Sequence, residues 1–357
     1  MLGLWLISTP TWANFDELED MATGFLASLS SEQRKAVSYG FKDDARATWS
    51  NLPILMTPPA GVLLAQLSDT QRHRVHRMMQ LSLSSQGYGK TQSIMWLDDV
   101  LRDIEQTSIA NSATANAIAR AMANDRSSGN YAIAIFGNPG DPAWGWKITG
   151  HHLAINISIV ESQIALTPAF YGSNPRVIQE GPYAGFAPLA AEHLLGLRFF
   201  NALTEAQRTQ AVIHNERPED VIEGPGRRGS LKKFEGLSTK GLTADQMQAL
   251  QRLVSEYIRN GNADGAGEHL DAIAAAGWNN LWFSWRGPTD GQPAFYYRVH
   301  GKRLLIEYNL QNPNHDHAIV RDGLNDYGED WLGHHYEEAH PTLEEALKTL
   351  RQAAGDD

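Results

Sequence analysis

The chain has 357 residues, of which 42% are hydrophobic and 20% are charged, so it can bury a full core as one large domain or two modest ones. Its formal net charge of −11 argues against a nucleic-acid-binding surface, which needs clustered basic residues to neutralise phosphates. The absence of cysteine excludes thiolate nucleophiles, iron–sulfur clusters, disulfides and zinc sites with thiolate ligands. Any transition metal must therefore be held by imidazole and carboxylate groups.

The N-terminus carries a short apolar run that ends in Thr11-Trp12-Ala13. Small residues at these positions resemble a signal peptide that is cleaved after Ala13, although the usual positively charged start is missing. The alternative is an ordinary apolar strand or helix end. We favour a shortened signal peptide at residues 1–13, which predicts a periplasmic or extracellular protein. No stretch of about 20 apolar residues exists to span a bilayer.

Residues 15–128 and 186–260 are predicted to be mainly helical. One pattern occurs four times: a Leu is followed by a Ser or Thr, and a Gln lies three residues after that hydroxyl residue. The hydroxyl residues are Ser30, Ser68, Thr204 and Thr243. This pattern is typical of a helix start, because the hydroxyl caps a free backbone N–H and the Gln reaches back to the capping residue. The four matches are compatible with a duplicated helical unit but are too short to establish one.

Residues 130–165 and 278–322 predict antiparallel β-sheet, because they are rich in β-branched and aromatic residues and are interrupted by turns. The predicted fold class is therefore α+β, with an antiparallel sheet core surrounded by capped helices. We treat residues 14–357 as a single domain, since no clean linker separates the two sheet-forming regions.

Alternation in the first sheet region places His152 on a polar face with Ala154, and His151 where the strand enters the core. In the second region, a hairpin turn at Gly301-Lys302 would bring three polar residues onto one face of the sheet. They are Arg298, His300 and Glu307.

Histidines gather in two distant parts of the chain, at His151-His152 and at His315-x-His317. Residues i and i+2 of a strand point the same way about 6.6–7 Å apart, so His315 and His317 can converge on one ion. We predict a mononuclear metal site formed by these residues, and leave open which of His151 and His152 is a ligand. An imidazole-rich set suits zinc or copper. The alternative is that the histidines are hydrogen-bonded supports of the sheet, and this is favoured for His334, His335 and His340, which we interpret as surface residues.

Other polar residues are candidates for the chemistry around this site. Glu192, in an otherwise apolar helical stretch, and Asp322 are the candidates for a catalytic carboxylate. Arg298, Arg321 and Tyr171 are the candidates for substrate binding, and His300 and Glu307 for orienting the metal ligands through hydrogen bonds. No G-x-S-x-G elbow and no H-E-x-x-H motif is present, so neither an α/β-hydrolase triad nor the commonest zinc-protease site is supported.

Several blocks occur in a specific order: W-G-W-K-I-T-G-H-H-L-A-I-N, T-P-A-F-Y-G-S-N-P, Y-Y-R-V-H-G, I-E-Y-N and N-H-D-H-A-I-V-R-D. In this order they resemble the uncharacterised domain of unknown function family 3500 over nearly the whole chain. The resemblance implies a bacterial or fungal type of protein that is often exported, but it implies no established reaction. In the family pattern the position of Asp316 is usually aliphatic. This implies that Asp316 faces the core while His315 and His317 share the other side, and it puts a ligand role for Asp316 in doubt.

These observations favour an exported metal-dependent enzyme in which a metal-activated water performs hydrolysis on a small-molecule or peptide substrate. Two alternatives remain. One is a copper-dependent oxidoreductase, and the other is a non-catalytic exported protein that binds a metal or an organic ligand. A catalytic site should leave one coordination position open, whereas a storage site should close its shell with four or more protein ligands.

Overall fold

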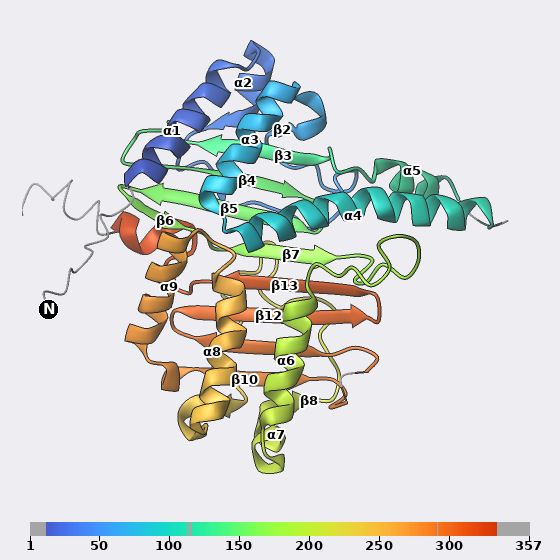
Figure 1. Cartoon of the computed structure of the whole chain (residues 1–357), viewed down its shortest axis with the longest axis vertical. Coiled ribbons are helices and arrows are strands. Elements are labelled where there is room, and N and C mark those ends of the chain that lie inside the picture. Colours follow the sequence, from blue (N-terminus) through green and yellow to red (C-terminus); the bar gives the residue numbers. More distant parts are fainter. Residues whose placement is uncertain (1–11, 113, 115, 291, 334–357) are drawn as a thin grey trace, which may run out of the picture.

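The computed structural model describes residues 12–333, except for positions 113, 115 and 291, and contains one large β-sheet with its helices packed against one face (Figure 1). The helices of the first half are α1 (Trp12–Ala27), α2 (Ser31–Val37), α3 (Asp69–Ser82), α4 (Ser85–Ala110) and α5 (Ala117–Asp125). Its strands are β1 (Ser38–Tyr39), β2 (Val62–Leu63), β3 (Tyr131–Phe136), β4 (Ala143–Gly150), β5 (Leu153–Val160), β6 (Gln163–Ala165) and β7 (Ala169–Ser173).

The second half of the chain continues the same sheet. Its helices are α6 (Ala190–Ala202), α7 (Glu205–Ala211), α8 (Ala244–Ile258) and α9 (Ala263–Ala276). Its strands are β8 (Val212–His214), β9 (Leu237–Ser238), β10 (Trp282–Arg286), β11 (Tyr296–Gly301), β12 (Leu304–Asn312) and β13 (His315–Arg321). The main path through the 13-stranded sheet is β1-β3-β4-β5-β7-β13-β12-β11-β10-β8, with β2, β6 and β9 paired beside it. The sheet is antiparallel except where β1 joins β3 and β8 joins β10, and the predicted α+β class is confirmed.

Apart from helix α5 and strand β6, which only the first half contains, the two halves repeat one order of elements. Two helices and a short strand (α1-α2-β1 and α6-α7-β8) lead through a loop to another short strand, two helices (α3-α4 and α8-α9) and a four-stranded meander. In each half, the first short strand pairs in parallel with the first strand of the meander, and the second short strand pairs with it antiparallel. The same topology therefore occurs twice along the sheet.

Reciprocal contacts relate the halves across their boundary. Strands β7 and β13 pair antiparallel, with Ala169 opposite Val320. On the helical face, the N–H of Ser84 donates to the carbonyl of Asn260 at 3.1 Å, and the N–H of Asn262 donates to the carbonyl of Ser82 at 3.0 Å. Such pairs, in which each half offers the other the same groups, are what a twofold axis produces. The chain consists of two copies of one structural unit related by an approximate twofold axis perpendicular to the sheet.

All four predicted helix starts are capping boxes. At the starts of α2, α3, α7 and α8, the hydroxyl oxygen of the capping residue accepts from the backbone N–H of the Gln. The side chain of that Gln accepts in turn from the backbone N–H of the capping residue. Equivalent glutamines also meet in each half: Gln71 Nε2 lies 3.3 Å from Gln33 Oε1, and Gln246 Nε2 lies 2.8 Å from Gln207 Oε1. The repeated motif is thus a feature of the duplicated unit.

The two faces of the sheet have different coverings. Helices cover one face, and loops 40–61 and 215–236 cover the other. Alternation along β5 sends Ile155 and Ile157 into the main core beneath the helices, while Ala154 joins a small apolar cluster beneath the loops. The other members of this cluster are Trp49, Phe170, Val221 and Ile319. His315 and His317 lie on the face covered by the loops. Each is an even number of residues from Ile319 on the same strand, so their side chains point to the same side as that of Ile319.

The predicted hairpin turn at Gly301-Lys302 is wrong. It pairs each residue of β11 with a residue two positions away from its observed partner on β12. Gly301 pairs with Leu304 and Arg298 with Glu307, so the turn residues are Lys302 and Arg303. Because side chains alternate with a period of two, a shift of two residues leaves each side chain on its original face. Arg298, His300 and Glu307 therefore share one face, as predicted.

Candidate metal centre

Three imidazoles from both halves of the chain converge on the face of the sheet that the loops cover. The Nε2 atom of His315 lies 2.9 Å from that of His152 and 3.0 Å from that of His317. One ligand atom from each of the three residues lies within 4.8 Å of the others. Tetrahedral zinc with Zn–N bonds of about 2.0–2.1 Å would separate such nitrogens by about 3.3 Å. A small adjustment of the rings would therefore accommodate an ion.

The backbone brings His152 to this point through a tight turn between β4 and β5. His152 has a φ of 61°, which a non-glycine residue adopts only when its surroundings hold it there. Its N–H donates to the carbonyl of Asn51 at 3.1 Å, and its carbonyl accepts from the N–H of Gly172 at 2.7 Å. The turn is thus fixed by the loop on one side and by β7 on the other.

Gly172 leaves room for two of the rings. A Cβ atom at this position would lie 2.8 Å from Cδ2 of His317 and 2.9 Å from Cδ2 of His152. Gly172 is also the residue paired with His317 in the β7–β13 ladder. Any side chain on this strand position would therefore push the two imidazoles apart.

Asp220, on the loop before Val221, fixes the orientation of His317. Its Oδ1 accepts from Nδ1 of His317 at 2.7 Å, which leaves the lone pair of Nε2 free for an ion. Burial alone would raise the pKa of the Asp220 carboxyl group, but the hydrogen bond and charge of His317, with smaller contributions from the N–H of Val221 and from Arg227, together lower it. Metal-binding histidines commonly have such a carboxylate behind them.

Glu307 fixes the loop that carries Asp220. Its two carboxylate oxygens accept from the N–H groups of Ile222 and Glu223 at 2.6 and 2.8 Å, and Oε2 also accepts from the hydroxyl of Tyr296 at 2.7 Å. Glu307 therefore acts on the site through the backbone of the loop and does not contact an imidazole ligand.

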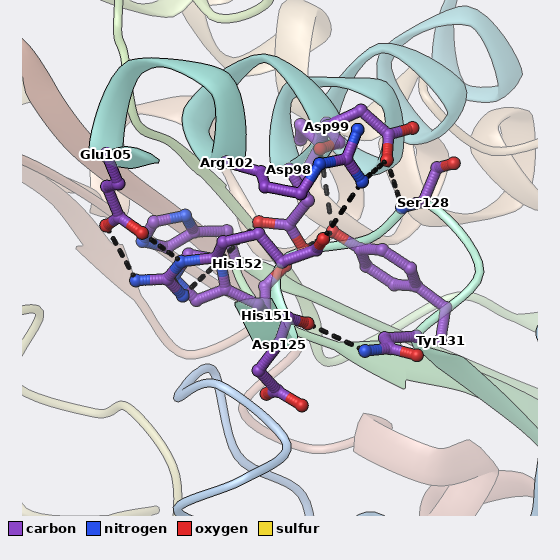
Figure 2. Close-up of polar contacts among 12 residues, drawn as sticks. Asp98, Asp99, Arg102, Glu105, Asp125, Ser128, Tyr131, His151 and His152 are labelled. Atoms are coloured by element: carbon purple, nitrogen blue, oxygen red, sulfur yellow. Dashed lines mark hydrogen bonds and ion pairs between the residues drawn. The ribbon is translucent and has the colours of Figure 1, made fainter. Parts of the chain in front are cut away.

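His151 supports the site from behind, because both of its ring nitrogens have protein partners. Nδ1 donates to Asp98 Oδ1 at 2.6 Å (Figure 2). Nη1 of Arg126 lies 3.2 Å from Nε2. Arg126 in turn pairs with Glu105 on α4 at 3.1 Å. The ring of His151 packs on that of His152 with centroids 3.7 Å apart. Of the adjacent pair, His152 is the member that joins His315 and His317.

The local electrostatics favour neutral imidazoles. Burial, together with the neighbouring imidazoles, lowers the pKa of His315 to about 3 and that of His152 well below its usual value. Neutral imidazole is the form that binds a metal. His315 is only half-buried, so the group is accessible from the side of this residue.

Two predicted carboxylates do not lie with the three histidines. Glu192 is on α6, on the helix-covered face, where it forms a buried ion pair with Lys90 at 2.6 Å. Asp322 follows β13 and pairs with Arg303 at 3.1 Å, while its Oδ1 accepts from two N–H groups of the next turn. The sequence shows that each carboxylate lies in or beside an apolar element, but not which face of the sheet it meets.

The predicted substrate-binding residues are also separate from the three histidines. Tyr171 points to the helix-covered face and is buried, since it alternates with Gly172 on β7. Arg321 donates to Asp326 at 2.7 Å, and Arg298 lies beside Glu235 and Ser284. His300 packs edge-on against Phe234, with ring centroids 4.6 Å apart.

Asp316 faces the helices, as the family resemblance implied. Its carboxylate accepts from the hydroxyl of Tyr308 at 2.8 Å.

The sequence did not single out Asp98, Arg126, Gly172 or Asp220. The one sign in the sequence was the glycine itself. A Gly inside a strand, as in F-Y-G-S, often marks a position where another group of the protein approaches the backbone closely. The proposed surface histidines His334, His335 and His340 lie outside the described residues, as do residues 1–11 of the predicted signal peptide.

Comparison with known proteins gives a family but no characterised relative. No curated protein and no solved structure matches the chain. A family model described as "Protein of unknown function (DUF3500)" matches residues 12–329, which include both repeats and all three converging histidines. The chain belongs to the DUF3500 family.

Proposed function

We propose that the protein is a metalloenzyme in which His152, His315 and His317 hold one divalent transition metal. The observation that carries the proposal is the convergence of three Nε2 atoms, with His317 oriented by Asp220. If the histidines were only supports of the sheet, each would be expected to find its own partner. Within the protein alone, Nε2 of His315 carries either one N–H or one lone pair and can satisfy only one of its two neighbouring nitrogens, whereas an ion would engage all three.

The number of ligands favours catalysis over storage. Among the described residues, the group contains three imidazoles and no fourth side-chain ligand. Catalytic zinc sites typically have three protein ligands and an open position, while structural sites are closed by four. A divalent metal in this position would lower the pKa of bound water to about 7 and so supply a nucleophile for hydrolysis.

The residues around the imidazoles have separate tasks in this proposal. Asp220 keeps Nδ1 of His317 protonated, so that Nε2 faces the ion. Asp98 and Arg126 occupy both nitrogens of His151, which prevents it from competing as a ligand and keeps it packed on His152. Arg126 also places a positive charge near the site, which would favour a substrate with a polarised or anionic oxygen.

Zinc is our preferred metal, with copper as the alternative, because three imidazoles suit both ions. Export to the periplasm or the outside of the cell is also part of the proposal, on the basis of the N-terminal sequence pattern. Within residues 12–333, apart from the undescribed positions, no helix has the length and apolar character needed to cross a membrane.

The test is the metal content of protein purified without a histidine tag, measured by elemental mass spectrometry. We expect one zinc or copper per chain in the wild type and none in a His315→Ala/His317→Ala variant. His73→Ala, at an exposed histidine of α3, is the matched control and should keep the metal.

Wild-type protein that takes up neither ion, even after incubation with both, would contradict the proposal. If metal is present, the hydrolytic step is tested next with activated carboxylic and phosphoric esters. Chelation should abolish turnover and zinc should restore it, whereas activity that depends on copper and oxygen would favour the oxidoreductase alternative.

A further inference from the structure

A cavity of about 370 Å³ lies on the loop-covered face of the sheet in the second repeat. Its walls come from loop 215–236, from the end of β11 and the turn after it, and from Arg321 at the end of β13. Arg321 is four residues from His317 on the same strand, so it shares the face of the metal centre at a distance of about 13 Å along β13. The cavity is therefore a separate site.

The first repeat has an equivalent cavity of about 360 Å³, between loop 40–61 and the end of β4. Two pairs of glycines show the equivalence. Gly150 and Gly301 each pair with the Leu that follows a two-residue turn. Gly61 and Gly236 each approach the first strand of the meander so closely that an added Cβ would lie 2.2 or 2.3 Å from a carbonyl oxygen.

The two cavities differ in charge. Among the described residues, those that line the first cavity are all uncharged. Its Thr57-Pro58-Pro59 corresponds to Lys232-Lys233-Phe234 of the second, because each segment ends two residues before its glycine. The second cavity is lined by five basic residues: Arg228, Lys232, Lys233, Lys302 and Arg321. The fold forms the first cavity without any charge, so a basic lining is not needed to build such a cavity.

Three of these cations are matched by carboxylates. The pairs, with their N···O distances, are Arg321–Asp326 at 2.7 Å, Arg228–Glu329 at 2.7 Å and Lys233–Glu235 at 3.0 Å. The lining also contains Glu223, whose Oε1 accepts from the N–H of Leu231 at 3.0 Å. The carboxylates at the cavity are thus already engaged within the protein.

The other two cations, Lys232 and Lys302, have no carboxylate partner in the part of the chain that the structure describes. Both are exposed, and they come from different segments, so folding brings two unmatched positive charges to one cavity in a protein whose net charge is −11. A lysine side chain has a flexible four-carbon stem, so both ammonium groups can reach a ligand there. An anion between them would replace their mutual repulsion with attraction.

An apolar surface lies beside the lysines. Phe234 is exposed although its ring stacks on that of Trp282, with centroids 4.7 Å apart. Leu231 and Leu305 also line the cavity. Small-molecule sites typically combine apolar walls with a few polar groups. The cavity therefore offers an apolar wall and two unmatched charges to the same ligand.

We propose that this cavity binds a small organic dianion, such as an aryl or alkyl phosphate. Its charged group contacts Lys232 and Lys302, and its apolar part contacts Phe234. Lysine commonly binds phosphate, as a point charge, and two lysines match a group with two negative charges. The proposal does not depend on the metal centre.

The test is ligand-observed NMR with phenyl phosphate as the probe, on full-length protein treated with a chelator at about pH 7.5, where the phosphate carries nearly two negative charges. Phenyl phosphate should bind with a Kd on the order of 1 mM. It should bind at least about fivefold more tightly than benzyl alcohol, which has the ring but no charge. Raising the salt concentration from about 0.05 to 0.3 M should weaken its binding, because ions screen exposed charges.

Charge variants locate the binding. Lys232→Gln/Lys302→Gln should weaken phenyl phosphate binding at least about fivefold, because both unmatched charges are lost. Lys35→Gln/Arg120→Gln removes two positive charges from exposed positions of α2 and α5 and should change the Kd by less than about twofold.

The apolar wall is tested by Phe234→Ala, which should weaken phenyl phosphate binding at least about threefold. Pro59→Ala, at the corresponding position of the first cavity, is the control and should leave binding unchanged. Equal binding of benzyl alcohol, no effect of salt, equal losses in a variant and its control, or no binding of phenyl phosphate to the wild type would each overturn the proposal. The last result would mean that the two lysines are ordinary solvated side chains.

Discussion

The carboxylate of Asp220 accepts from Nδ1 of His317 at 2.7 Å, and this contact joins a covering loop to the strand that supplies two of the three imidazoles. Nδ1 is thereby kept protonated and Nε2 points towards His315. The loop is thus part of the proposed metal centre, although none of its residues is one of the three imidazole ligands.

Asp220→Asn should weaken zinc binding by about 10- to 100-fold, because the amide is a poorer acceptor and no longer fixes the tautomer of His317. The dissociation constant would be measured by competition with a chromogenic chelator. Glu219→Gln is the matched control, since it removes one negative charge from the neighbouring, exposed position. Equal losses in both variants would show that the loop acts only through its overall charge.

Gly172→Ala should weaken metal binding at least about tenfold and destabilise the fold by about 1–3 kcal/mol, because the new Cβ would overlap the rings of His152 and His317. The two quantities are measured by metal titration and by urea unfolding. Gly89→Ala, on α4, is the control because a Cβ there meets nothing within 4 Å. That variant should be neutral or slightly stabilising, since Ala favours a helix over Gly.

Glu307→Gln should lower both stability and zinc affinity, although Glu307 contacts none of the three imidazoles. One side-chain oxygen becomes an NH₂ group that cannot accept from the loop, so at least one buried N–H of Ile222 or Glu223 loses its partner, at a cost of about 1–3 kcal/mol. The loop would then hold Asp220 less firmly. Metal titration of the folded variant separates the two effects: unchanged zinc affinity would mean that Glu307 supports only the fold.

Acidification should destabilise the protein in part through His300. Burial, with a further contribution from Arg298, lowers the pKa of His300 to about 4, whereas an unfolded histidine has a pKa of about 6.5. Between these values the unfolded chain binds a proton that the folded chain does not, so the free energy of unfolding falls as the pH falls, by at most about 1.4 kcal/mol per pH unit from this group.

Urea unfolding at pH 7, 6, 5 and 4.5 would measure this contribution. His300→Gln should reduce the loss of stability on acidification, while His73→Gln, at an exposed position, should behave as the wild type does. A His300→Gln variant with the same pH dependence as the wild type would contradict the assignment.

The part of the metal centre that depends on local chain geometry could be predicted from the sequence. His315 and His317 share a face because a strand has a period of two, and the capping boxes formed because cap and Gln are three residues apart. The period of two also explains why Arg298 and Glu307 were correctly predicted to share a face although the predicted turn was wrong. The pairing was shifted by two residues, and an even shift leaves every side chain on its original face.

Long-range packing decided what the sequence could not show. Asp220 reaches His317 because residues more than 80 positions further along the chain fix the path of the loop: Glu307 accepts from two of its N–H groups, and Asn309 donates to the carbonyl of Pro218. Glu192 was expected near the histidines, but the helix that carries it packs on the opposite face, where Lys90 neutralises its charge. No local sequence pattern predicts that Asp220 lies beside His317 or that Glu192 lies away from the histidines. Each placement depends on which face of the sheet is covered by the loop or helix that carries the residue.

The approximate twofold axis has a consequence for how the centre is assembled. One repeat contributes His152 from the turn after β4, and the other contributes His315 and His317. At the equivalent turn of the second repeat, after β11, the chain has Lys302 and Arg303 in place of His151 and His152. Neither repeat carries a complete ligand set, so a bound ion would fasten one repeat to the other across their junction. Fragments cut between the repeats should then reassemble more tightly when zinc is added.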